Sequence, residues 1–179
     1  MELEPPEGIR AELLRGTVVM TPSPDLVHKR SVTDVVDQIP RSRWSRLQAM
    51  RVDMFDDVSA PVPDVVVVER DACPKQGALV PAGVVTAVIE VVSGRSADRD
   101  YLLKRSVYAA AKVPAYLIID PVMAQCVLLS EPKGGGEDAD YRRQRHAFFG
   151  ELMPLEPLGL ELDTSEFAAY ENVRPHRYP

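Results

Sequence analysis

The sequence predicts an α/β fold in which a mixed central β-sheet is flanked by helices. Short runs rich in Val, Ile and Leu recur along the chain between clusters of Pro, Gly, Asp and Ser, as expected of buried strands. Two longer segments instead repeat their apolar residues every three or four positions, as helices do. The order of these segments, with strands before and after each helix, is typical of an α/β domain.

The first half of the chain contains a hairpin-like region, a helix and two strands. Residues 12–20 are predicted to form the hairpin-like strand region, which ends at two prolines. A helix follows, with Asp25 as its N-cap and Pro40 as its end. The next apolar runs predict strands at residues 47–55 and 62–68.

The second half alternates strands with one long helix. That helix keeps apolar residues at helical spacing and stops before a proline. Gly-containing segments at 71–83 and 133–140 are predicted loops. In chain order, the predicted elements are a strand at 84–92, the helix at 97–112, a hairpin of strands at 115–120 and 124–130, a strand at 141–149 and a short helix at 165–171.

Length and composition indicate one soluble domain. We treat residues 1–179 as a single domain, with an irregular N-terminal segment at 1–10 and a C-terminal extension at 154–179. The sequence starts without the basic and apolar regions of a signal peptide, and no apolar run approaches the roughly 20 residues that span a bilayer. Cys73 and Cys126 form neither a disulfide framework nor a metal-type spacing. We therefore expect a cytoplasmic protein that does not contact membranes.

The net charge of −6 argues against a surface that is basic throughout and binds nucleic acid everywhere. It leaves a local basic groove open, because net charge does not describe how the charges are distributed.

Two carboxylates stand within or beside apolar strand segments. Asp64 directly precedes four valines, and Glu90 has apolar neighbours on both sides. Burying a carboxylate without a partner is costly, so each needs a counter-charge, hydrogen bonds or a metal ion. If the two acids converge, their hard oxygen ligands suit Mg²⁺ or Mn²⁺. The alternative for each acid is a solvent-facing strand end or a structural pair with an arginine.

The helix behind Glu90 carries a lysine at the border of its apolar stripe. Asp100, Lys104 and Tyr108 lie at i, i+4 and i+8 and therefore share one side of the helix. A lysine in that place can extend toward a carboxylate site. The alternative is an exposed Asp100–Lys104 ion pair of little energetic consequence.

Taken together, these segments resemble the Uma-two family of restriction-endonuclease-like proteins, within the PD-(D/E)XK nuclease superfamily. The family pattern is Pro-Asp before a strand, then Glu-Val-x-Ser, then Asp-x-x-x-Lys-Arg-x-x-Tyr, then Tyr-x-x-x-Asp-Pro. All four motifs occur here in order, at residues 63–64, 90–93, 100–108 and 116–121. The resemblance extends to the opening "AELLRGTVVMTPSPDLVH" and covers most of residues 10–150.

The resemblance implies a restriction-endonuclease-like core and assigns roles to several residues. Asp64 and Glu90 match the two acidic metal ligands, and Lys104 matches the lysine on the following helix. Three departures stand out. Val92 occupies the place of the superfamily's usual lysine two positions after the glutamate, Gly94 replaces a common proline, and Leu117 replaces a common aromatic residue. The remaining matched positions, which line the implied site without an assigned role, are Glu12, His28, Asp100 and Tyr108.

The resulting hypothesis is a Mg²⁺- or Mn²⁺-dependent endonuclease acting on DNA, with Asp64, Glu90 and Lys104 as catalytic residues and no organic cofactor. The alternative is a non-catalytic binding or regulatory module that keeps the nuclease fold. The resemblance also suggests a homodimer. Leucines of the C-terminal extension would offer apolar surface to a partner, unless the extension packs on its own domain; they are Leu152, Leu155, Leu158, Leu160 and Leu162.

Two arginine clusters are secondary candidates for phosphate contacts, although charged segments of this kind are usually solvated. The first surrounds Trp44 and the second lies in the last predicted strand. They consist of Arg41, Arg43 and Arg46, and of Arg142, Arg143, Arg145 and His146.

Overall fold

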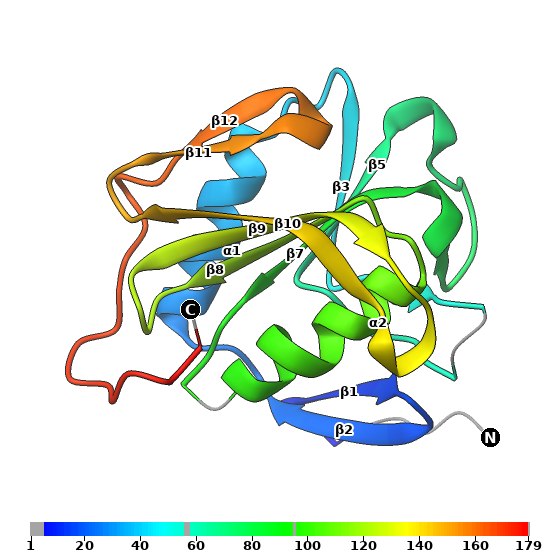
Figure 1. The fold of residues 1–179 in the computed structure, drawn as a ribbon, viewed down its shortest axis with the longest axis horizontal. Helices are drawn as coiled ribbons and strands as arrows, with labels where there is room; N and C mark the ends of the chain where they lie inside the picture. The colour runs from blue at the N-terminus through cyan, green and yellow to red at the C-terminus, as the bar shows by residue number, and fades with distance from the viewer. Residues whose placement is uncertain (1–5, 56–57, 95, 179) are drawn as a thin grey trace.

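A computed structural model describes residues 6–55, 58–94 and 96–178 of the chain. Its centre is a six-stranded sheet in the order β10-β9-β8-β7-β5-β3 (Figure 1). Every neighbouring pair is antiparallel except β7 and β8, which are parallel. The predicted α/β class with a mixed sheet is therefore confirmed. The strands are β3 (Trp44–Gln48), β5 (Val65–Glu69), β7 (Val85–Val91), β8 (Ala115–Asp120), β9 (Gln125–Lys133) and β10 (Asp140–Phe148).

Helices α1 (Leu26–Gln38) and α2 (Lys104–Ala110) cover opposite faces of this sheet (Figure 1). Alternate residues of β5 show the division, because Val65 and Val67 pack in the cluster that includes α1, whereas Val66 and Val68 pack in the cluster that includes α2. All four valines are fully buried. A continuous apolar run is the expected sequence of a strand that is covered on both faces.

Both helices lie where the sequence placed them. The Asp25 carboxylate caps α1 by accepting a hydrogen bond from the His28 backbone N–H at 3.0 Å, and the helix ends before Pro40. The predicted helix at 97–112 is also present, but it contains a π-helical turn at Arg99–Leu103 directly before α2. Within the described residues, short 3₁₀ turns also occur at Arg70–Ala72, Ala82–Val84, Gly136–Asp138 and Glu156–Leu158.

A separate hairpin lies below the sheet, next to α2 (Figure 1). Its strands β1 (Ile9–Leu14) and β2 (Thr17–Pro22) pair antiparallel and are joined at Arg15 and Gly16. Both joining residues have positive φ, which matches the tight turns that suit hairpin twist. The predicted irregular segment at 1–10 is wrong at its end, since Ile9 already belongs to β1; residues 1–5 lie outside the described residues.

The predicted strand at 47–55 is wrong. Two short strands occupy this region in different sheets, because β3 ends at Gln48 and β4 (Val52–Asp53) pairs in parallel with β6 (Val80–Pro81). Between them Ala49 adopts a left-handed conformation with φ of 50°, which interrupts the extended chain. Strand β6 also lies in a segment predicted as a loop.

The predicted helix at 165–171 is also wrong, and the extension begins with a hairpin instead. Strands β11 (Leu152–Leu155) and β12 (Leu160–Asp163) pair antiparallel. After them, the Asp163 carboxylate accepts a hydrogen bond from the Ser165 N–H at 2.9 Å, and this local turn competes with a helix start.

The leucines of this hairpin pack on their own domain. Leu155, Leu158 and Leu162 belong to the core cluster under α1, whereas the Leu152 side chain is exposed. The apolar surface that favoured a homodimer is therefore largely covered within the chain, and the dimer stays a prediction without that support. Within the described residues, no helix has both the length and the apolar character needed to cross a membrane.

Leu162→Ala tests whether the C-terminal hairpin is part of the core. The side chain is fully buried, so we expect a loss of about 2–5 kcal/mol in the free energy of unfolding. Leu152→Ala, on the same hairpin but 57% exposed, serves as the control and should change it by less than about 0.5 kcal/mol. Urea unfolding measures both, and similar losses in the two variants would contradict this packing.

Candidate functional site

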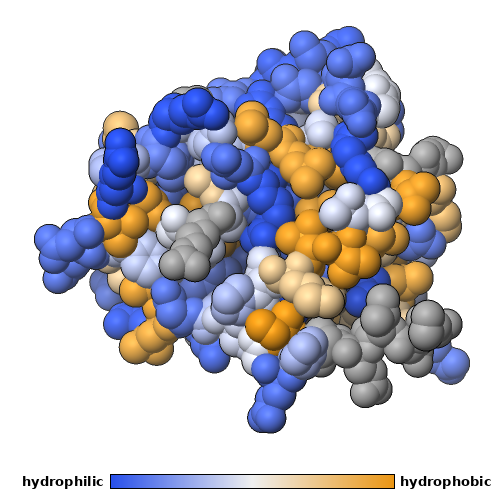
Figure 2. All heavy atoms as spheres, turned by 90° about the horizontal axis from the view of Figure 1, so that it is seen from below, coloured by the Kyte–Doolittle hydropathy of each residue, from blue (hydrophilic) through white to orange (hydrophobic). Residues whose placement is uncertain are grey.

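A cavity of about 370 Å³ opens between the β1–β2 hairpin, the start of α1 and the end of β7. Viewed from the hairpin side, hydrophilic residues form a band beside apolar areas (Figure 2). The cavity brings together most of the residues that the sequence singled out. Its charged lining residues are Arg10, Glu12, Asp25, His28, Asp64, Glu90, Arg99, Asp100 and Lys104.

Strand register brings the two predicted acids together. Asp64 directly precedes Val65, which pairs with Ile89, the residue before Glu90. The two acids therefore meet at the same level of adjacent strands, and both fall on the sheet face covered by α2. Asp64 is 4% exposed and Glu90 is 3% exposed. The solvent-facing alternative for these acids is thus excluded.

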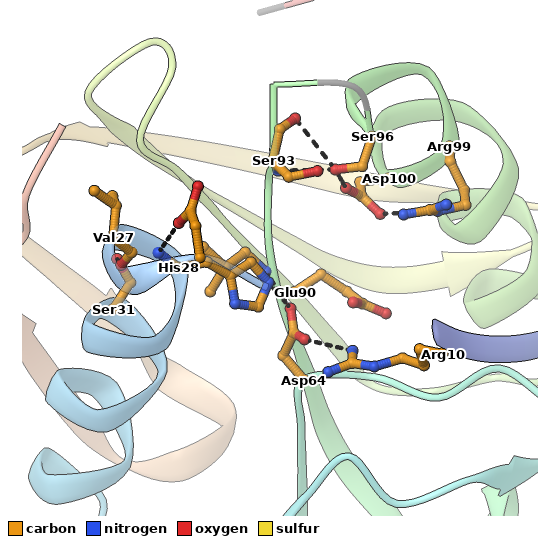
Figure 3. Close-up of polar contacts among 12 residues, drawn as sticks. Arg10, Val27, His28, Ser31, Asp64, Glu90, Ser93, Ser96, Arg99 and Asp100 are labelled. Atoms are coloured by element: carbon orange, nitrogen blue, oxygen red, sulfur yellow. Dashed lines mark hydrogen bonds and ion pairs between the residues drawn. The ribbon is translucent and has the colours of Figure 1, made fainter. Parts of the chain in front are cut away.

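Asp64 accepts hydrogen bonds on both of its oxygens (Figure 3). Arg10 Nη1 lies 2.8 Å from Oδ1, while the Val91 backbone N–H and His28 Nε2 approach Oδ2 at 2.8 and 3.0 Å. Burial tends to raise the pKa of Asp64, but His28, Arg10 and the Val91 N–H outweigh it and lower the pKa to about 2. Asp64 is therefore held as an oriented carboxylate.

The pKa of Glu90 is shifted in the opposite direction from that of Asp64. Its Oε1 accepts hydrogen bonds from Lys104 Nζ at 2.7 Å and from the Tyr108 hydroxyl at 2.5 Å. Burial raises the pKa of Glu90 to about 8; Lys104 opposes this shift, while the nearby acids Asp64, Asp100 and Glu12 add to it. Burial and the neighbouring acids therefore outweigh the cation that contacts Glu90, which is Lys104.

Lys104 lies at the centre of this group, with only 1% of its surface exposed. Its Nζ is 3.1 Å from Glu12 Oε1 and 4.0 Å from Asp100 Oδ1, in addition to its bond with Glu90. Burial favours the neutral amine, yet the surrounding carboxylates raise the pKa of Lys104 above its usual value. The exposed Asp100–Lys104 pair considered as an alternative is thus absent, because both groups are buried.

The π-helical turn places Asp100 beside this lysine. The Tyr116 hydroxyl donates to the Asp100 backbone carbonyl at 2.9 Å, and the Ser96 hydroxyl donates to the Asp100 carboxylate at 2.5 Å. Arg99 Nε lies 3.9 Å from the same carboxylate (Figure 3). Burial raises the pKa of Asp100 to about 6. A π-helical turn at a functional site is a recurrent feature of proteins.

The cavity is therefore lined by more acidic side chains than permanently positive ones. Four buried carboxylates, from Glu12, Asp64, Glu90 and Asp100, face the cations of Arg10, Arg99 and Lys104. Glu12 Oε1 is not aligned for a hydrogen bond with Lys104, and His28 Nδ1 has no hydrogen-bond partner in the described part of the chain. In the described part of the chain, no group of three or more His, Cys, Asp or Glu side chains is placed to hold a metal ion.

The family model of Uma2, described as "Putative restriction endonuclease", matches residues 1–165. The chain belongs to the Uma2 family. No curated protein matches the sequence. A crystal structure titled as a putative nuclease belonging to DUF820, from Anabaena variabilis ATCC 29413, is similar over 92% of both chains, with a TM-score of 0.66 and 15% sequence identity. The predicted family is confirmed, and family and fold together indicate a restriction-endonuclease-like nuclease.

This Uma2 chain has site residues that the sequence analysis did not select. Arg10 precedes Glu12 by two positions, so strand alternation places both on the same face of β1, and that signal could have identified it. Ser96 and Arg99 depend on the turn before α2 and had no comparable signal. Tyr108 contacts Glu90 but is absent from the residues that line the cavity.

The two arginine clusters lie outside the Uma2 site. Arg46 donates to the backbone carbonyls of Val36 and Ile39, at 2.8 and 2.6 Å, and thereby completes the end of α1. On the edge strand β10, Arg143 and Arg145 pair with glutamates at 2.8 Å each. Arg46, Arg143 and Arg145 therefore have structural partners within the chain.

Lys104→Met tests the buried charge cluster. Removing the ammonium leaves Glu90 and Glu12 without their cation, so we expect a loss of about 3–5 kcal/mol in the free energy of unfolding. Lys29→Met, at an exposed position of α1, is the control and should stay within about 0.5 kcal/mol. Adding Glu12→Gln to Lys104→Met should recover part of the loss. Urea unfolding in EDTA gives all three values, and equal effects of the two lysine variants would refute the cluster.

Proposed function

We propose that this chain is a divalent-metal-dependent endonuclease that hydrolyses phosphodiester bonds in DNA. The observation that carries the proposal is the convergence of Asp64 and Glu90 on one cavity, with the Lys104 ammonium 2.7 Å from Glu90. Two acids and a lysine in one cavity are the groups that metal-assisted phosphodiester hydrolysis needs. Restriction-endonuclease-like nucleases generally use divalent metals, and Mg²⁺ or Mn²⁺ is the ion proposed here.

The residues present fit such an ion. Carboxylate oxygens are preferred ligands of Mg²⁺, which is commonly held by one or two carboxylates and keeps water and substrate phosphate as its other ligands. Asp64 and Glu90 would hold it. The excess of carboxylates around Glu90 favours a bound cation electrostatically. When bound, the ion polarises the phosphoryl group and lowers the pKa of a water ligand.

The protein groups then have distinct tasks. Arg10, His28 and the Val91 N–H keep Asp64 ionised and fixed in orientation. Lys104 orients Glu90 and presents positive charge to the cavity, where it would stabilise the charge that develops on the phosphate or orient the attacking water.

One observation favours the alternative of a non-catalytic binding module. Val92 stands where the superfamily usually has its lysine, and it is fully buried in the core. Catalysis therefore requires that Lys104, which reaches Glu90 from the helix, take the place of that lysine.

Melting experiments test the metal site. Binding of a cation to the native state alone raises stability by about 2.7 kcal/mol at a concentration 100 times its Kd, which corresponds to several degrees in Tm for a chain of this size. We expect this rise when Mn²⁺ replaces EDTA with wild type, and little rise with Glu90→Gln or Asp64→Asn. Asp25→Asn, which alters another acid of the cavity rim and keeps a good N-cap, should respond as wild type does. An equal rise in all four proteins would remove the metal site.

Cleavage of covalently closed plasmid DNA tests the activity itself. With Mg²⁺ or Mn²⁺ present, wild type should convert the plasmid to nicked and linear forms, and EDTA should stop this. Glu90→Gln should lower the rate by about two orders of magnitude or more, as the loss of a group that stabilises the transition state does. Full activity in this variant would contradict the assignment, and a wild type that binds DNA without cleaving it would favour the binding module.

A further inference from the structure

A second hollow, of about 480 Å³, adjoins the cavity that holds the carboxylates. Arg10, Ser23 and Pro24 line both spaces, so the two share a wall at the base of the β1–β2 hairpin. This junction is held in place by Ser23, whose backbone N–H and hydroxyl both donate to the Gly8 carbonyl, at 2.8 and 3.0 Å. The remaining lining residues are Gly8, Ile9, Ala11, Ala49, Met50, Arg51, Val62 and Ala78.

The charge of the second hollow is opposite to that of the cavity. Arg10 and Arg51 are its charged lining residues, and within the described part of the chain no carboxylate lines it. By contrast, five acids line the cavity, and they are Glu12, Asp25, Asp64, Glu90 and Asp100. An anion that cannot approach the carboxylates without a metal therefore finds a favourable place directly beside them.

Arg10 lies at the boundary between the two spaces. One of its N–H groups donates to Asp64 Oδ1 at 2.8 Å, and in the described residues its guanidinium makes no other hydrogen bond. Its side chain is 26% exposed. A guanidinium has five N–H donors in a planar fork that matches two phosphate oxygens. Arg10 can thus keep its bond to Asp64 and still bind an anion on its other side.

Arg51 also lines the second hollow. Its side chain is exposed, and the described residues provide no ion pair for it. Its backbone position is fixed, because the Arg51 carbonyl accepts a hydrogen bond from the Val80 N–H at 2.9 Å and the next residue begins β4. The hollow is therefore lined by two arginines together with small or apolar residues, and a hydrogen bond holds the backbone at Arg51 in place.

We propose that the second hollow binds a phosphate of the DNA strand next to the phosphate that is cleaved, with Arg10 and Arg51 as its ligands. This inference rests on the proposed nuclease function, because it assumes that a strand enters the cavity. The shared wall favours a strand phosphate over a free anion, since a strand whose cleaved phosphate lies in the cavity would bring a neighbouring phosphate close to Arg10. It also reconciles nucleic-acid binding with a net charge of −6.

Strand binding without metal tests the subsite, because binding is then measured without cleavage. The probe is a fluorescently labelled 12-nucleotide single-stranded DNA in EDTA, followed by anisotropy over a range of salt concentrations. We expect Arg51→Gln to weaken binding about tenfold, the size of one charge-assisted hydrogen bond. The slope of log K against log salt concentration should fall by about 0.7, the value for one single-strand phosphate contact. Arg143→Gln, on the distant edge strand β10, is the matched control and should leave both quantities unchanged.

Arg10→Lys separates the two roles of Arg10. Lysine keeps a positive charge for Asp64 but lacks the planar fork, so strand binding should weaken while the rise in Tm with Mn²⁺ is retained.

If wild type binds the strand and both Arg51→Gln and Arg10→Lys bind it equally well, the subsite is wrong and the nuclease function stands. If wild type binds no strand, both proposals fail. If inorganic phosphate raises the Tm of wild type but not of Arg51→Gln, and the strand does not bind, the hollow is a site for free phosphate and the assignment to a strand is overturned.

Discussion

The buried ammonium of Lys104 is the interaction on which the rest of the site depends. Four carboxylates, each at most 4% exposed, surround one cavity, and a cluster of that kind is strongly disfavoured without an internal cation. Lys104 supplies this cation from α2, which lies on the face of the sheet opposite α1. Helix α2 follows directly on the π-helical turn that carries Asp100. The bond from Lys104 to Glu90 therefore links the helix to the strand and fixes the acid that we propose as a metal ligand.

The same electrostatics link elements that share no backbone pairing. The β1–β2 hairpin is separate from the six-stranded sheet, yet Arg10 pairs with Asp64 and Glu12 pairs with Lys104. The hairpin thus closes one side of the cavity, and its Arg10 lines both the cavity and the positively charged hollow. As a result, a space lined mainly by acids and a space lined by two arginines lie side by side, and the proposed function assigns the first to a cation and the second to a phosphate.

Much of this site could be predicted from the sequence, and the failures have physical causes. Asp64 and Glu90 stood out because a carboxylate in an apolar strand needs a partner, and helical periodicity placed Lys104 at the border of an apolar stripe. The family resemblance then favoured a shared site over the structural alternatives. No local pattern indicated the π-helical turn, in which the Asp100 carbonyl accepts a hydrogen bond from the Tyr116 hydroxyl of β8, a contact that forms only in the folded chain. The break at Ala49 likewise reflects a backbone conformation that alanine does not favour, so no local signal indicated it.

Anomalous diffraction from crystals soaked in Mn²⁺ tests the central claim most directly. The account predicts one strong peak in the cavity, about 2 Å from a carboxylate oxygen of both Asp64 and Glu90, with Lys104 still bonded to Glu90. A peak at another site, or a peak that contacts only one of the two acids, would contradict the shared cation on which the proposed function rests.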